Sequence, residues 1–294
     1  MARNKHHRPA GKYDRRPPSR AEETSPAGSA PGQRPRRPER KMARGGSRDD
    51  GNWLYGRHAV LAAAANPFRE LRQLWITREA DARFGAELAQ ALSGRDGGAV
   101  QPQIVDRGDI EQVLGNAVHQ GIALLAAALP EQDLSDVLPA EEQDALVLVL
   151  DQVTDPHNVG AILRSAEAFG AAGVVVTERH APEETGTLAK AASGAIERVP
   201  LIRVINLARE LDYLKSRGFW ILGLAGEATQ SLTQGKPGGR VALVLGAEGE
   251  GLRRLTREHC DVLVRLPMTG SMPSLNVSNA AAVALYELSR DKLK

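Results

Sequence analysis

The chain has 294 residues, of which 42% are hydrophobic and 25% are charged, as in ordinary soluble proteins of one or two domains. No apolar run approaches the length of a membrane span. The one cysteine, Cys260, cannot form an internal disulfide, and the seven histidines show no metal-ligand spacing. These features argue against a membrane-spanning or disulfide-stabilised protein and predict no metal site. They make the cytoplasm the expected compartment.

Positive charge is concentrated in residues 1–50, which hold 14 Lys and Arg against 6 Asp and Glu, whereas the remaining 244 residues hold 24 against 30. This segment contains no Leu, Ile, Val, Phe or Trp but seven of the 17 prolines. We therefore expect a disordered basic tail over 1–51. Its arginine clusters would attract RNA phosphate. A solubilising extension is the alternative, as is a transit peptide, which the prolines and acidic residues fit poorly.

Residues 52–129 have the patterns of a small α/β domain. The patterns predict helices over 53–65, 81–92 and 107–115, and strands over 71–77, 100–105 and 121–127. The polar, acidic segment 130–143 contains two prolines, which indicates a linker.

Residues 144–294 alternate between apolar strands and amphipathic helices. The predicted strands cover 145–150, 173–176, 219–224, 241–245 and 262–266. The predicted helices cover 159–169, 188–192, 207–215, 252–259 and 275–291. This alternation predicts a parallel sheet with helices on both faces. Because ligands of such sheets bind beyond the carboxyl ends of the strands, functional residues are expected just after each strand.

The first such segment follows the strand 145–150 and runs from Asp151 to Gly160. Asn158 stands where a helix cap would be expected. Arg164 follows six residues later, about one and two-thirds helical turns further on. An arginine there could bind a phosphate with two parallel hydrogen bonds. The alternative is a cap and a surface ion pair without a ligand.

The second segment, Gly246–Ala247–Glu248–Gly249–Glu250–Gly251, follows the strand 241–245. Its three glycines would permit the backbone to approach a ligand closely. The spacing is not that of a dinucleotide-binding fingerprint, and no lysine follows as in a phosphate-binding loop. Since the two glutamates would repel a pyrophosphate, a zwitterionic or cationic ligand fits better.

The third segment, 266–279, leads into the last predicted helix. Ser274 and Asn276 are small polar residues at the amino end of this helix, where they could bind a ligand. Ordinary helix capping is the alternative, and it is the preferred interpretation for Ser278 and Asn279.

Together and in this order, the three segments resemble the motifs of the SpoU family of SPOUT-class RNA methyltransferases. The resemblance covers 145–291 and includes 190–195, while 55–60 and 119–121 resemble the family's L30e-like substrate-binding domain. It implies an α/β chain in which the L30e-like domain precedes a parallel-sheet domain tied in a trefoil knot. It also implies a homodimer whose active sites draw on both subunits. S-adenosylmethionine would be bound mainly by the backbone at Gly246, Leu266, Leu275 and Leu224.

The implied activity is 2′-O-methylation of a guanosine ribose in 23S ribosomal RNA, because the resemblance is strongest to enzymes of that kind. The resemblance assigns functional roles to Asn158, Arg164, Glu248, Ser274 and Asn276. A free guanidinium stays protonated, so we expect Arg164 to bind phosphate and stabilise the developing alkoxide. Asn158, Ser274 and Asn276 would orient the ribose and Arg164, and Glu248 would orient the cofactor or the neighbouring subunit. A tRNA ribose methyltransferase and a non-catalytic RNA-binding or ribosome-assembly protein are the alternatives.

Overall fold

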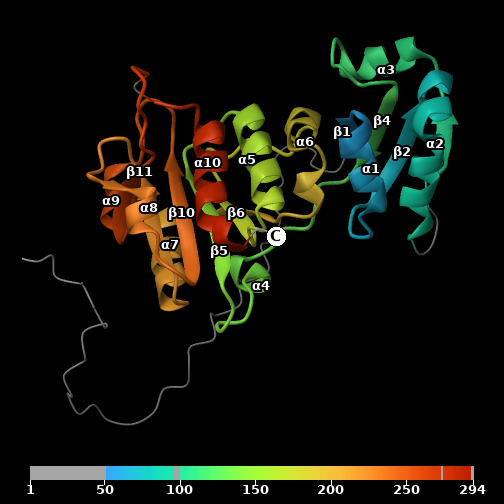
Figure 1. Cartoon of the computed structure of the whole chain (residues 1–294). Helices are drawn as coiled ribbons and strands as arrows, with labels where there is room; N and C mark the ends of the chain where they lie inside the picture. Colours follow the sequence, from blue (N-terminus) through green and yellow to red (C-terminus); the bar gives the residue numbers. More distant parts are fainter. Residues whose placement is uncertain (1–50, 96–99, 273, 293–294) are drawn as a thin grey trace, which may run out of the picture. The chain divides into compact units, whose positions relative to one another are not determined.

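The computed structural model describes residues 51–95, 100–272 and 274–292, and these form two β-sheets with flanking helices (Figure 1). The prediction of disorder falls on residues 1–50, which lie outside the described residues. No helix in the described part of the chain is both long and apolar enough to cross a membrane.

The first sheet has four strands in the order β1-β4-β2-β3. Strand β2 pairs with β3 in parallel, while β4 pairs antiparallel with β1 and β2. The strands are β1 (Asn52–Tyr55), β2 (Leu71–Ile76), β3 (Pro102–Ile104) and β4 (Ile122–Ala126), and the helices are α1 (Arg57–Ala65), α2 (Arg78–Ser93) and α3 (Arg107–Leu114). The predicted alternation of strands and helices over 71–127 is confirmed.

The prediction of a helix from Trp53 onward is wrong for its first residues, which form β1 instead. Residues 52–55 pair one-to-one with β4, from Asn52 opposite Ala126 to Tyr55 opposite Ala123. Gly56, with φ +86°, then turns the chain into α1. The strand depends on a partner about 70 residues away, which local periodicity does not reveal.

The second sheet has seven strands in the order β7-β6-β5-β10-β8-β11-β9, and every pair is parallel, as predicted. The strands are β5 (Ala145–Asp151), β6 (Gly173–Thr177), β7 (Leu201–Val204), β8 (Trp220–Leu224), β9 (Gln230–Ser231), β10 (Arg240–Gly246) and β11 (Val262–Arg265). The sequence patterns missed β7 and β9, which are short strands at the two edges of the sheet.

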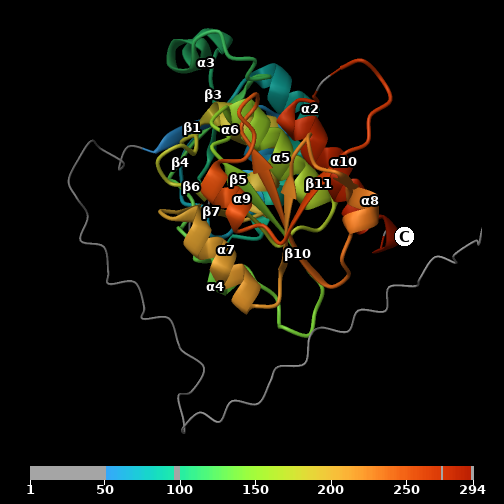
Figure 2. The same ribbon diagram turned by 90° about the vertical axis from the view of Figure 1, so that its left-hand side faces the viewer.

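Helices cover both faces of this sheet, because alternate strand residues enter two hydrophobic clusters (Figure 2). The helices are α4 (Leu134–Val137), α5 (Pro156–Ala168), α6 (Gly186–Ala192), α7 (Leu207–Ser216), α8 (Leu232–Gly235), α9 (Arg254–Glu258) and α10 (Val277–Ser289). In β5, Leu148 and Leu150 pack on the side of α5, α6 and α10, whereas Val147 and Val149 pack on the side of α4 and α7.

The connecting segment 130–143 is polar in composition, but part of it is buried. It contains the single turn α4, and Leu134 in that turn is buried in the same cluster as Val147 and Val149. The connection is therefore packed against the second sheet, which its composition did not indicate.

Helices α5 and α6 approach closely because residue 160 is a glycine. A Cβ atom there would lie 2.5 Å from the Ala191 Cβ and 2.9 Å from both the Ala192 nitrogen and the Leu188 oxygen. Any side chain at this position would force the two helices apart.

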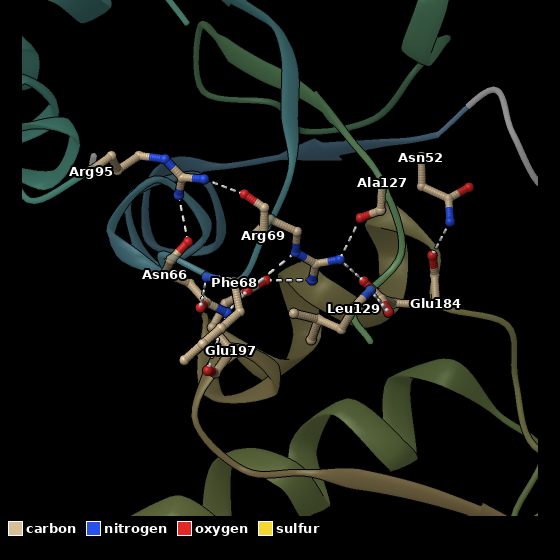
Figure 3. Close-up of polar contacts among 9 residues, drawn as sticks. All are labelled: Asn52, Asn66, Phe68, Arg69, Arg95, Ala127, Leu129, Glu184 and Glu197. Atoms are coloured by element: carbon tan, nitrogen blue, oxygen red, sulfur yellow. Dashed lines mark hydrogen bonds and ion pairs between the residues drawn. The ribbon is translucent and has the colours of Figure 1, made fainter. Parts of the chain in front are cut away.

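The two sheets share one continuous hydrophobic cluster. We call residues 52–129, with the first sheet, the first half of the chain, and residues 144–292, with the second sheet, the second half. A buried ion-pair network spans the contact between the two halves (Figure 3). Arg69, just before β2, binds Glu184 and Glu197 from the second half; its Nη2 lies 2.5 Å from the Glu197 Oε1. The Arg69 and Glu197 side chains are only 1% and 2% exposed. Asn66 also donates a hydrogen bond of 2.8 Å to the Glu197 Oε2.

Burial alone would lower the pKa of Arg69, but its hydrogen bond to Glu197 and the charges of Glu197 and Glu184 reverse this effect. The pKa of Arg69 therefore lies above its ordinary value, and the guanidinium stays charged within the contact.

Replacing Arg69 with alanine should destabilise the protein strongly. The change leaves the buried Glu197 without its counterion, which typically costs about 3–5 kcal/mol of unfolding free energy. Urea denaturation would measure this loss. Arg198→Ala is the matched control, because the Arg198–Glu167 pair is 54% and 32% exposed and should contribute at most about 1 kcal/mol. Equal losses in the two variants would contradict the assigned role of Arg69.

Candidate active site

A cavity of about 690 Å³ lies where β8, β10 and β11 end. This is the carboxyl edge of the parallel sheet, where a ligand site was expected, and the volume suits a small molecule. Seven of the nine predicted site residues line it: Leu224, Gly246, Glu248, Leu266, Ser274, Leu275 and Asn276. Asn158 and Arg164 do not.

The glycines of the loop 246–251 fold the loop onto itself. A Cβ atom on Gly246 would lie 2.1 Å from the Gly251 carbonyl carbon, and the Gly251 nitrogen donates a hydrogen bond of 2.9 Å to the Ala247 oxygen. Gly249 and Gly251 have φ +83° and +68°, where side chains are disfavoured. The tight turn by itself therefore requires these glycines.

Glu248 joins three segments that are distant in sequence. Its Oε1 accepts hydrogen bonds of 2.7 Å from the Asn276 Nδ2, 3.2 Å from the Asn158 Nδ2 and 3.3 Å from the Val277 backbone nitrogen. The Asn276 Nδ2 also donates 3.0 Å to the Asn158 Oδ1. The structure therefore brings Asn158, Glu248 and Asn276 together in one hydrogen-bonded cluster beside the cavity.

Helix capping fixes the orientation of Asn276. Its Oδ1 accepts from the backbone nitrogens of Ser278 and Asn279, at 2.9 and 3.4 Å, so that its Nδ2 must face Glu248. Helix α10 accordingly begins at Val277, two residues later than predicted. Asn276 is both the cap of this helix and a member of the cluster. Ser278 and Asn279, expected to be capping residues, instead donate their backbone N–H groups to the cap Asn276.

Asn158 is not the cap of α5, contrary to its expected position. Asp155 caps this helix by accepting a 2.9 Å hydrogen bond from the His157 nitrogen, and Pro156 occupies the first turn. Proline is favoured there because its missing N–H would have no partner anyway. The side chain of Asn158 is consequently available to Glu248.

Asp151 holds the glycine loop in place, a role that the sequence motifs did not indicate. It ends β5 fully buried, and its carboxylate accepts hydrogen bonds from the Arg253 backbone nitrogen at 3.0 Å and the Arg253 Nε at 2.6 Å. These bonds anchor the end of the glycine loop to the central strand. The signal in the sequence was an acidic residue directly after a run of six apolar ones.

Arg164 is exposed on α5 and is not among the residues that line the cavity. Among the described residues its side chain has no hydrogen-bond or ion-pair partner, so the alternative of a surface ion pair is not supported. Within one chain, Arg164 therefore forms no hydrogen bond with the cluster of Asn158, Glu248 and Asn276.

Charges of both signs line the cavity. Glu227, Glu248 and Glu250 line it together with Arg257 and Arg265, and the lining also contains leucines and methionines. The hydrogen bond from Arg257 holds the pKa of Glu227 below its usual range. Among the described residues no group of His, Cys, Asp and Glu is arranged to hold a metal ion. The lining suits a ligand that carries both charges and an apolar part.

The chain matches two families. Residues 145–286 match the SpoU rRNA Methylase family, and residues 53–132 match the family described as RNA 2'-O ribose methyltransferase substrate binding. The computed fold is similar to the SpoU methyltransferase AviRb from Streptomyces viridochromogenes in complex with the cofactor AdoMet. The TM-score is 0.69 at 24% identity, covering 83% of this chain and 91% of that one.

Sequence relatives cover nearly the same region. The 23S rRNA (guanosine-2'-O-)-methyltransferase RlmB of Haemophilus influenzae is 45% identical over 244 residues, which make up 82% of this chain and 98% of the relative. An uncharacterized tRNA/rRNA methyltransferase of Synechocystis is 42% identical over 81% of this chain and 62% of its own length. With both family matches and a near full-length relative at this identity, the chain belongs to the SpoU rRNA methylase family.

Proposed function

We propose that this protein uses S-adenosylmethionine to methylate the ribose 2′-oxygen of a guanosine in 23S ribosomal RNA. The observation that carries the proposal is the cluster of Asn158, Glu248 and Asn276 beside a cavity of small-molecule size. The substrate rests on the similarity to RlmB of Haemophilus influenzae. We assign its action to the cytoplasm, where bacterial ribosomal RNA is made.

The cavity fits S-adenosylmethionine in its chemistry. This cofactor combines a positive sulfonium, a zwitterionic amino-acid end and a flat adenine. Glu227, Glu250 and Arg265 offer both signs of charge, while Leu224, Leu266 and Leu275 offer apolar contacts for the adenine. The compact turn at Gly246 would present backbone groups to the cofactor.

We propose further that the active form is a homodimer and that the chain around the site is knotted. On α10, Val283 and Tyr286 are 49% and 48% exposed, which leaves an apolar face for a second subunit. Strand β11 lies between β8 and β9, yet α10 packs on α5 in the middle of the sheet. The connection from β11 to α10 therefore returns toward the middle of the sheet, and such a return would close the knot.

The chain's own residues would mainly position and stabilise. When bound, S-adenosylmethionine supplies a methyl group that is already strongly electrophilic. The cluster of Asn158, Glu248 and Asn276 would orient the ribose so that its 2′-oxygen aligns with that methyl group. Arg164 would bind RNA phosphate and stabilise negative charge developing on the oxygen. Because Arg164 lies apart from its own cavity, we assign it to the active site of the partner subunit.

The substrate can be tested directly. We expect the purified protein to methylate unmodified 23S RNA but not unmodified tRNA, because the matched relative acts on 23S RNA. The methylated positions would be mapped by resistance to alkaline cleavage, which only a ribose 2′-O-methyl group confers. Methylation confined to tRNA would overturn the choice of RNA. Methylation on a base nitrogen would overturn the ribose assignment.

The cofactor site can be tested with two glycine variants. Gly246→Ala should abolish or weaken S-adenosylmethionine binding at least tenfold, since the added Cβ would lie 2.1 Å from backbone of the same turn. Gly270→Ala is the control, because a Cβ there meets no atom within 4 Å. Calorimetry would measure the affinity, with circular dichroism to confirm folding. Normal affinity in a folded Gly246→Ala variant would place the cofactor elsewhere.

A third experiment separates chemistry from folding at Arg164. Arg164→Ala should lower the methyl-transfer rate by at least a hundredfold while cofactor affinity and stability stay near wild type, because its side chain is exposed and has no partner among the described residues. Arg209→Ala, an exposed arginine on α7, removes the same charge and should retain full activity. An active Arg164→Ala variant would remove Arg164 from the mechanism.

A further inference from the structure

A second cavity, of about 650 Å³, lies in the first half of the chain, where α1, α2 and α3 begin. None of its lining residues belongs to the cavity assigned to the cofactor. We call it the arginine cavity, because Arg57, Arg78, Arg83 and Arg107 all line it.

Most of the arginines in residues 52–129 lie at this cavity. This half has seven arginines and no lysine. Arg69 is buried in the contact between the halves, Arg95 donates to the backbone oxygens of Ala64, Asn66 and Arg69, and Arg72 pairs with Glu70 on β2. Each of the four remaining arginines lines the arginine cavity.

Two of these four arginines, Arg78 and Arg83, can bind an anion at little cost. Arg78 has no hydrogen-bond or ion-pair partner among the described residues. The Arg83–Glu79 pair is 3.6 Å apart and 73% and 83% exposed, so it is weak and easily exchanged. Arg57 and Arg107 pair with Glu87 and Glu111.

Carboxylates neutralise part of the positive charge. Glu79 and Asp106 line the arginine cavity, and Glu87 and Glu111 hold Arg57 and Arg107 from beside it. The positive charge open to a ligand is therefore that of Arg78 and of Arg83, whose pair with Glu79 is exposed. Phe84 and Val105 add apolar surface to the lining, and the guanidinium of Arg57 lies 6.0 Å from the centre of the Phe84 ring. Positive groups around an apolar surface suit a nucleotide, whose phosphate and sugar-base parts need the two kinds of contact.

The rim of the arginine cavity is attached to the second half of the chain. Gln120, held at φ +58°, accepts a 2.9 Å hydrogen bond from the Arg57 nitrogen. Nearby, the Lys190 Nζ on α6 donates 2.6 Å to the Val118 oxygen. A Cβ on Gly194 would lie only 3.0 Å from the His58 oxygen. An RNA bound here would therefore be held in a fixed position relative to α6, and through Gly160 relative to α5.

We infer that the arginine cavity binds a backbone phosphate of the substrate RNA, with its flanking nucleotide, at a point separate from the methylated ribose. This inference rests on the proposed function and adds to it the place where the first half grips the RNA. Arg78 and Arg83 are the main phosphate ligands, because they are the least engaged within the protein.

The test compares variants of the full chain in RNA binding and methylation. Arg78→Ala should weaken binding of 23S RNA about tenfold, and Arg78→Ala with Arg83→Ala should weaken it further. Each lost contact should reduce the slope of log affinity against log salt by about 0.7–0.9. The maximal rate with saturating RNA and the affinity for S-adenosylmethionine should stay near wild type. Arg78→Lys should restore most of the salt slope, since it keeps the charge.

The matched control is Arg72→Ala, which removes the same charge from the same half outside the arginine cavity. If the double variant binds RNA with the affinity and salt slope of Arg72→Ala while the wild type is active, the inference is overturned and the proposed function stands. If the wild-type protein methylates no RNA at all, the proposed function itself fails.

Discussion

One carboxylate oxygen, the Oε1 of Glu248, receives hydrogen bonds from α5, from the residue before α10 and from the first nitrogen of α10. The loop that carries Glu248 can take its shape only because Gly246 lacks a side chain and because Asp151 anchors its far end through Arg253. One edge of the cavity, the amide side chains of Asn158 and Asn276 and the start of the last helix therefore share one support. Charge-assisted hydrogen bonds are about twice as strong as neutral ones, which suits a junction of three segments.

A single buried side chain also joins the two halves of the chain. The Arg69 guanidinium, buried and paired with Glu184 and Glu197, holds the first sheet against the segment around α6. Helix α6 in turn packs tightly on α5 at Gly160. A buried pair of this kind adds little net stability compared with well-packed apolar residues, because removing the charges from water costs much of what their attraction returns.

Much of this arrangement could be predicted from the sequence. Strand and helix alternation identified the parallel sheet, since buried strands there read as continuous apolar runs. The first strand could not be found, because its helix-like sequence becomes a strand only by pairing with β4. The hydrogen bond between Asn158 and Asn276 joins positions 118 residues apart, a contact that only the fold creates. The anchoring role of Asp151 could not be predicted either, because its partner Arg253 lies 102 residues away in the sequence.

The continuous core beneath both sheets also limits how RNA can be chosen. Because the two halves pack on one shared core, their packing would fix the distance between the arginine cavity and the proposed site of methyl transfer. An RNA that fills both would have to present a phosphate and a target ribose at that spacing, whatever the nucleotides between them. Such a protein would recognise the folded shape of its substrate, and a fragment carrying the right letters in an unfolded strand would be a poor match.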